Sequence, residues 1–133
     1  MKKYILILTA VFYFGTTAFA QTSHSKVVTN LSAERFKAII GNDKDGMIID
    51  LRTTDEISKG YIKGAVQIDF LAKGAEKQID KLDKNKTYYI YCAGGGRSSE
   101  AAEYMEKQGF KNVYNFEKGF SDWEKKGFPV EKK

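Results

Sequence analysis

Residues 87–109 read TYYIYCAGGGRSSEAAEYMEKQG, and this stretch decides the fold. Residues 87–91 are rich in β-branched and aromatic side chains, which favours a β-strand. A run with one cysteine and three consecutive glycines follows at 92–99. Residues 100–108 have the composition of a helix, which Gly109 would end. The stretch therefore predicts a strand, a glycine-rich loop and a helix.

The rest of the chain alternates short apolar runs with helical patterns. Strands are expected at 27–28, 47–51, 65–68 and 113–116, and helices at 33–40, 54–59, 76–82 and 120–125. Strands that alternate with helices call for an α/β fold with a parallel sheet covered on both faces. A chain of 133 residues has room for one such domain.

Residues 1–20 have the pattern of a secretory signal, because two lysines precede an apolar run and Ala18-Phe19-Ala20 fits a cleavage site. The alternative is a retained membrane anchor, which needs about 20 continuous apolar residues. Small and polar residues interrupt this run too early for that. We therefore expect export, into the periplasm, with cleavage after Ala20. A polar tail at 21–26 and a single domain at 27–133 would follow.

Charge and residue counts exclude several classes of site. Without residues 1–20 the formal net charge falls from +5 to +3, and the lysines are interleaved with acidic residues, as on a solvated surface. We expect no nucleic-acid partner. The single histidine, His24, lies in the polar tail and far from the single cysteine, so no metal site and no cofactor are predicted. A lone cysteine also cannot form an internal disulfide.

Cys92 follows directly on a strand, and ligands of parallel α/β sheets collect at the carboxyl ends of strands. The glycines at 94–96 let successive backbone N–H groups turn inward around an anion. A helix that begins near Ser98 or Ser99 would add the positive end of its dipole. We expect these donors and the Arg97 guanidinium to stabilise an accessible thiolate. The pKa of Cys92 should then lie below its free value of about 8.5.

Two other interpretations of the loop are a plain strand-to-helix turn and a buried, inert cysteine. The reactive interpretation is favoured because the sole cysteine, three glycines, an arginine and the start of a helix coincide within eight residues. The planar fork of Arg97 also matches oxyanions and stays charged, so we expect Arg97 to bind an anionic substrate.

This loop resembles the active-site pattern C-x-x-G-x-R-S of the rhodanese, or sulfurtransferase, family, with Cys92, Gly95, Arg97 and Ser98 at the fixed positions. Three more segments agree with the family, namely DLR at 50–52, GYIKGA at 60–65 and GFSDWEKKGFPV at 119–130. The similarity covers most of residues 27–130. It implies a three-layer domain with a central, mostly parallel sheet of about five strands flanked by helices.

The chain departs from the family at two positions. Tyr61 stands where the family commonly has histidine, and Lys118 stands where a glycine often precedes Gly119. Tyrosine can donate a hydrogen bond but does not titrate near neutral pH. Neither departure removes the nucleophile.

The resemblance implies that Cys92 accepts a sulfane sulfur, holds it as a persulfide and passes it to a thiophilic acceptor. The donor would be a small sulfur-containing anion such as thiosulfate, or a persulfide, and the acceptor a thiol or a cyanide-like nucleophile. The substrate-binding residues would be those of the loop: Ala93, Gly94, Gly95, Gly96, Arg97 and Ser98. Asp50 and Arg52 resemble a structural polar pair of the family, and Trp123 is expected to pack in the core.

Three rival functions use the same architecture. Small phosphatases of this fold need five residues between cysteine and arginine, whereas four separate Cys92 from Arg97. A non-catalytic binding module would be expected to lose the cysteine, and a redox-sensing thiol would keep it. The sequence leaves the physiological donor and acceptor, the reducing partner and the oligomeric state open.

Overall fold

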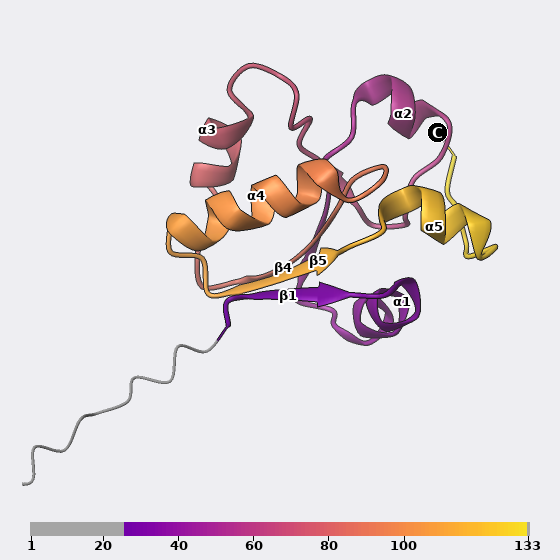
Figure 1. Ribbon diagram of the computed structural model, residues 1–133, viewed down its shortest axis with the longest axis horizontal. Coiled ribbons are helices and arrows are strands. Elements are labelled where there is room, and N and C mark those ends of the chain that lie inside the picture. The colour runs from indigo at the N-terminus through magenta and orange to yellow at the C-terminus, as the bar shows by residue number, and fades with distance from the viewer. Residues whose placement is uncertain (1–25, 133) are drawn as a thin grey trace, which may run out of the picture.

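The computed structural model describes residues 26–132 and is shown in Figure 1. The predicted signal at 1–20, His24 and most of the polar tail lie outside the described residues. The elements follow one another as β1 (Val28–Leu31), α1 (Ala33–Asn42), β2 (Met47–Asp50), α2 (Thr54–Ser58), β3 (Val66–Gln67), α3 (Ala75–Asp80), β4 (Thr87–Tyr91), α4 (Gly96–Lys107), β5 (Asn112–Phe116) and α5 (Gly119–Lys125).

The strands form one five-stranded sheet in the order β1-β5-β4-β2-β3, and all neighbouring pairs are parallel. The predicted α/β class with a mostly parallel sheet is therefore confirmed. Outside the sheet, Tyr61 and Glu131 form one antiparallel bridge, which brings the end of the chain back to the segment after α2. Since all five strands run the same way, their carboxyl ends, and the loops that follow them, share one edge.

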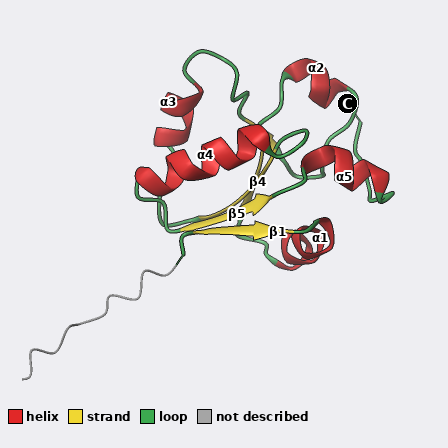
Figure 2. Cartoon of the chain, in the orientation of Figure 1, coloured by secondary structure: helices red, strands yellow, loops and turns green. Residues whose placement is uncertain are grey.

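Helices cover both faces of the sheet, which gives three layers (Figures 1 and 2). On one face, α3 and α4 pack on side chains that include Ile49, Ile90 and Val113. On the other face, α1 and α5 enclose an aromatic cluster around Phe36. Trp123 belongs to this second cluster and is 3% exposed, as predicted for a core residue.

The strand β4 lies in the middle of the sheet and is buried on both faces. Successive side chains of a strand point to opposite faces. Tyr88 and Ile90 accordingly face α3 and α4, whereas Tyr89 and Tyr91 face α1 and α5. Cys92 continues the first series, so its side chain lies under the start of α4.

The helix after the loop starts earlier than predicted. We expected it to begin near Ser98 or Ser99, but α4 begins at Gly96 with Gly95 as its N-cap. Gly95 has φ of +102°, a left-handed conformation that glycine adopts without the strain of a side chain. Arg97 and Ser98 therefore lie in the first turn of α4 and not in the loop.

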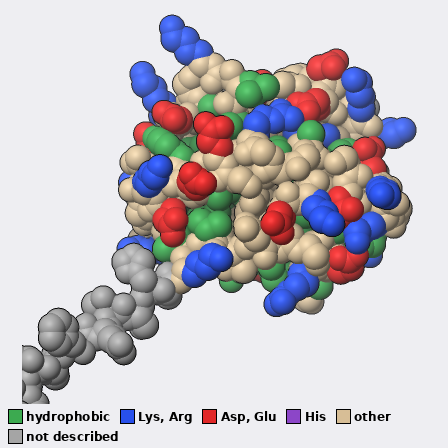
Figure 3. All heavy atoms as spheres, viewed as in Figure 1, with side chains coloured by type: hydrophobic (Ala, Val, Ile, Leu, Met, Phe, Trp, Pro, Cys, Tyr) green, Lys and Arg blue, Asp and Glu red, His purple; other side chains and the backbone are tan. Residues whose placement is uncertain are grey.

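The surface shows no single-sign field on the face seen in Figure 3, where basic and acidic side chains are interspersed. This matches the interleaved charges of the sequence. No helix among residues 26–132 is long and apolar enough to cross a membrane.

Candidate active site

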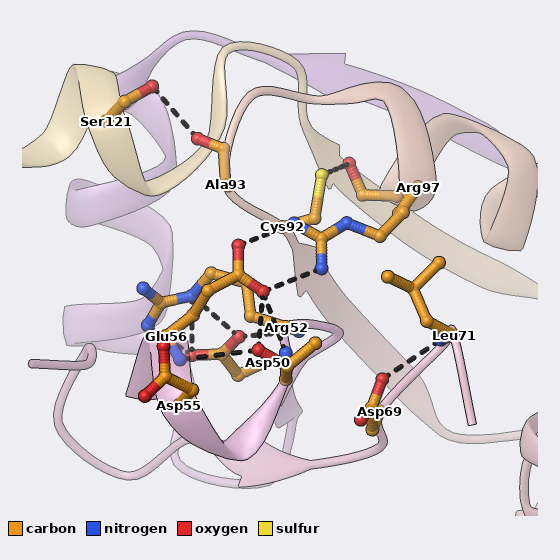
Figure 4. Close-up of polar contacts among 12 residues, drawn as sticks. Asp50, Arg52, Asp55, Glu56, Asp69, Leu71, Cys92, Ala93, Arg97 and Ser121 are labelled. Carbon is orange, nitrogen blue, oxygen red and sulfur yellow. Dashed lines mark hydrogen bonds and ion pairs between the residues drawn. The ribbon is translucent and has the colours of Figure 1, made fainter. Parts of the chain in front are cut away.

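The Cys92 sulfur lies inside a turn formed by the glycine loop and the first turn of α4 (Figure 4). The backbone N–H of Gly95 donates to Sγ over 3.0 Å. The thiol of Cys92 donates to the Ser98 hydroxyl over 3.6 Å, and that hydroxyl donates to the Gly95 carbonyl over 3.2 Å. Of the backbone donors expected around the sulfur, the N–H of Gly95 lies within hydrogen-bond distance of Sγ.

The sulfur is less accessible than we expected. Cys92 is 1% exposed and belongs to the core cluster that α4 covers. The expectation of an accessible sulfur was wrong because the side chain points to the face of β4 under α4, where the loop backbone closes over it. The bulk of any donor must stay outside this loop while its sulfur approaches Sγ.

Burial and hydrogen bonding act on the Cys92 thiol in opposite directions. Burial raises its pKa, because a thiolate loses hydration. The backbone N–H and hydroxyl of Ser98 and the backbone N–H groups of Gly95 and Gly94 favour the anion, and their combined effect is larger. The pKa of Cys92 is consequently lowered below its ordinary value, in the predicted direction. The donors of Ser98, Gly95 and Gly94 are the main cause, and the nearby Arg97 guanidinium adds a smaller electrostatic contribution.

The loop is held from outside by the turn after β5 and by the first turn of α5. The backbone N–H of Phe120 donates to the Cys92 carbonyl over 2.8 Å. Ser121 donates to the Ala93 carbonyl from its backbone N–H, over 3.0 Å, and from its hydroxyl, over 2.9 Å. A Cβ on Gly95 would lie 1.9 Å from the Glu117 carbonyl oxygen, so only glycine permits this close approach. The segment after β5 thus fixes the shape of the loop.

Arg97 makes a bidentate ion pair that the sequence analysis missed. Its two terminal nitrogens donate to the two carboxylate oxygens of Glu56 over 2.8 and 2.7 Å. We expected Arg97 to bind an anionic substrate, and the structure pairs its positive charge with the carboxylate of Glu56. The pKa of Arg97 is raised, chiefly by Glu56 and to a smaller extent by the nearby Cys92 and Asp69.

Glu56 is placed by the start of α2. Thr53 caps this helix, and Glu56 reaches back to the Thr53 backbone N–H over 2.9 Å and to its hydroxyl over 3.0 Å, which completes a capping box. The hydrogen bonds from Arg97 and Thr53 lower the pKa of Glu56 to about 2. The pattern Thr53-x-x-Glu56 is the sequence signal for the box. This pattern does not indicate that Glu56 also pairs with Arg97.

Asp50 and Arg52 form a buried pair behind the site, with exposed fractions of 1% and 3%. Arg52 donates to both carboxylate oxygens of Asp50 and to the Gly60 carbonyl, and its guanidinium stacks 3.8 Å from the Phe120 ring centre. The Tyr91 hydroxyl completes the network by donating to Asp50 over 2.6 Å. Within residues 26–132, no buried side-chain nitrogen or oxygen of this network lacks a hydrogen-bond partner, and the pair joins β2, the segment after α2 and α5.

The two residues that depart from the family pattern, Tyr61 and Lys118, lie in different surroundings. Tyr61 is half-buried and lines a small pocket of about 140 Å³ that also contacts Asp50 and Gln67. Lys118 is exposed and directly precedes α5, beside Gly94 of the loop.

Comparison with known proteins identifies the family of this chain. A family model described as "Rhodanese-like domain" matches residues 32–126. The "Putative sulfur carrier protein YrkF" of Bacillus subtilis (strain 168) is 36% identical over 102 residues, 77% of this chain, and the chain spans about half of that relative, 54% of its length. A "Sulfurtransferase" of Allochromatium vinosum is 28% identical over 104 residues, 78% of this chain and 95% of the relative.

Solved structures show the same fold. The crystal structure of a rhodanese-like domain protein from Staphylococcus aureus superimposes with a TM-score of 0.67 at 32% identity, covering 79% of this chain and 98% of that one. The matched residues include the cysteine loop, the buried pair behind it and the turn that holds it. This chain is therefore a member of the rhodanese-like sulfurtransferase family.

Proposed function

We propose that the chain transfers sulfane sulfur through a persulfide on Cys92. The observation that supports this most directly is the ring of donors around Sγ, above all the Gly95 N–H at 3.0 Å. These donors lower the pKa of the thiol and raise the fraction of thiolate near neutral pH, and the thiolate is the nucleophilic form.

The chemistry divides into two displacements, as expected for covalent catalysis. In the first, the Cys92 thiolate attacks the sulfane sulfur of the donor. A bond forms between Sγ and this sulfur, and the bond to the rest of the donor breaks, so the leaving group departs with the electron pair. In the second, an acceptor attacks the outer sulfur of the persulfide, takes it and returns Cys92 to the thiolate. No external oxidant or reductant is needed.

The loop suits this intermediate because its donors can serve either sulfur of a persulfide anion. Ser98 is held by its bond to the Gly95 carbonyl, so it serves as a donor in the loop and not as a second nucleophile. Arg97 acts by placing the first turn of α4 against α2 through Glu56.

Intact-mass spectrometry tests the proposal. Purified protein is incubated with thiosulfate or with an organic persulfide, and then with cyanide. The wild-type protein should gain one sulfur atom from at least one donor and release thiocyanate. Cys92→Ser should do neither, and Cys92 is the only cysteine, so no other thiol can substitute for it. An exposed serine variant, Ser58→Ala, serves as the control that keeps the sulfur adduct.

Other outcomes contradict the proposal and identify its rivals. Hydrolysis of a phosphate ester without any sulfur adduct would indicate a phosphatase. A sulfenic acid formed under mild peroxide without any persulfide would indicate a redox sensor. A wild-type protein that does none of these would be a binding module.

We also propose that the protein is exported to the periplasm and cleaved after Ala20. The support is the sequence of residues 1–20, with two lysines, an apolar run and Ala18-Phe19-Ala20. Expression of the full chain in a bacterium, followed by fractionation and N-terminal sequencing, should give a periplasmic protein that begins at Gln21. Leu8→Arg, which breaks the apolar run, should prevent processing. An uncleaved wild-type protein in the cytoplasm would overturn this.

A further inference from the structure

The charge nearest to the sulfur is already neutralised. Both terminal nitrogens of Arg97 are bound by Glu56, and the carboxylate of Asp69 acts on the same guanidinium. Ala93 and the glycines at 94–96 carry no charge. An anion whose charge lies directly beside the transferred sulfur, as in thiosulfate, would therefore meet no unpaired cation from the loop.

Unpaired positive charge occurs instead in a hollow beside the loop, which we call the lysine hollow. It has a volume of about 390 Å³, is open to solvent and is lined by Gly94, Lys118, Ser121, Asp122 and Lys125. Asp122 lies 3.9 Å from another lysine, Lys126, outside the lining. Within residues 26–132, neither of the two lining lysines forms an ion pair.

The lysine hollow is fixed to the nucleophile through backbone contacts. The hydrogen bonds from Phe120 and Ser121 to the carbonyls of Cys92 and Ala93 join the start of α5 to the loop. A Cβ on Gly119 would lie 2.6 Å from the Cys92 carbonyl oxygen, which shows how closely the two segments approach. Lys118 is thus adjacent in sequence to a residue in contact with the nucleophile's own backbone.

We propose that the lysine hollow binds the anionic end of an organic sulfur donor, a persulfide whose carboxylate is separated from its sulfane sulfur by a short carbon chain. This inference rests on the proposed function and specifies its substrate class. The neutral loop would receive the sulfur while Lys118 and Lys125 bind the carboxylate. Ser121 also lines the hollow, but its hydroxyl donates to the Ala93 carbonyl, so the two lysines are the groups that would bind the carboxylate.

The transfer step balances without another reactant. The Cys92 thiolate attacks the terminal sulfur of R–S–SH and forms a new bond to it, which gives Cys–S–SH. The S–S bond of the donor breaks, and R–S⁻ leaves with the electron pair. The numbers of sulfur atoms, protons and charges are equal on both sides. The carboxylate on R stays unchanged and only positions the donor.

A donor series tests the proposal on the whole protein. The persulfides of 3-mercaptopropanoate, 3-mercaptopropanol and 3-aminopropanethiol end in a carboxylate, a hydroxyl and an ammonium group at similar length. Single-turnover loading of Cys92 is followed by intact mass in the wild type, in Lys118→Gln with Lys125→Gln, and in Lys107→Gln. Lys107 is the control because it is exposed and lies at the opposite end of α4 from the loop.

Each exposed lysine is expected to raise the rate of sulfur transfer from the carboxylate persulfide to Cys92 roughly threefold. The double variant should therefore react with this donor about tenfold more slowly than the wild type. Its rates with the hydroxyl persulfide and with thiosulfate should change less than about twofold, and Lys107→Gln should change none of the rates. Added salt should reduce the wild-type preference for the carboxylate persulfide, because screening weakens exposed charges.

Two results separate the failure of this inference from the failure of the proposed function. If the double variant slows all donors equally or none of them, the lysine hollow is not a carboxylate subsite, although sulfur still reaches Cys92. If the wild type acquires sulfur from no donor in the series nor from thiosulfate, the proposed function fails and this inference fails with it.

Discussion

Replacing Glu56 with glutamine should destabilise the protein in a pH-dependent way. Glu56 accepts hydrogen bonds from Arg97 and Thr53, which lower its pKa from 4.5 to about 2. The difference corresponds to roughly 3 kcal/mol in favour of the charged form. Because 30% of the Glu56 side chain is exposed, solvent screening reduces the expected contribution to about 1–2 kcal/mol.

The lowered pKa of Glu56 determines how its contribution to stability changes with pH. A carboxylate with a lowered pKa stabilises the folded state above its unfolded value of 4.5, and this contribution is lost as the pH falls from 4.5 through about 2. Glutamine can still occupy the third position of a capping box, so the local start of α2 should survive. Glu56→Gln should therefore be about 1–2 kcal/mol less stable than the wild type at pH 7. The two proteins should approach equal stability near pH 2.

Urea unfolding at a series of pH values measures this difference. Asp55→Asn is the matched control, because Asp55 is in the same helix and pairs with Lys59 while their side chains are 84% and 74% exposed. The control should change stability by less than about 0.5 kcal/mol. A Glu56→Gln protein as stable as the wild type at pH 7, or a difference that does not vary with pH, would refute the proposed role of the ion pair.

Three further predictions concern the loop and its support. The alkylation rate of Cys92 by iodoacetamide should titrate with a pKa below that of a free thiol, and an ordinary value would contradict the donor ring. Gly119 and Gly127 both have φ of +68°, so replacing either with alanine should introduce the same backbone strain. Only Gly119 abuts the Cys92 carbonyl, so only Gly119→Ala should also shift the titration of Cys92. Asp50→Asn should lower the unfolding free energy by about 3 kcal/mol, measured in urea, because it leaves the Arg52 guanidinium buried without its counter-charge; a loss below about 1 kcal/mol would argue against this.

The fold was predictable from local patterns. The strand β4 at Thr87–Tyr91 and its glycine-rich exit could be recognised from composition alone. The start of α4 could not, because glycine and serine are poor helix formers and the sequence placed the helix further along. The close contact of Gly95 with the Glu117 carbonyl oxygen and its left-handed φ accompany a helix that starts at Gly96. A tertiary contact of this kind overrides the local preference.

The partner of Arg97 could not be predicted from the sequence either. Glu56 and Arg97 are 41 residues apart. The sequence already accounts for Glu56 as part of a capping box and for Arg97 as part of the cysteine-loop pattern, so neither residue calls for a distant partner. Only the topology, which places α2 and α4 at the same edge of the sheet, brings them together. The burial of Cys92 was missed for a related reason. A strand buried on both faces has no polar side to indicate where the next side chain points.

The segment after β5 has a part in the site that its residue types do not reveal. It contains no nucleophile, yet residues from Glu117 to Ser121 contact or hydrogen-bond the backbone at Cys92, Ala93 and Gly95. These contacts are made mostly by backbone atoms, so a side chain of this segment that takes no part in them can vary without deforming the loop. Lys118 approaches Gly95 only with its backbone nitrogen, and its exposed side chain borders the lysine hollow. Substitution at this position therefore offers a way to change which donor is bound while the geometry around the sulfur stays constant.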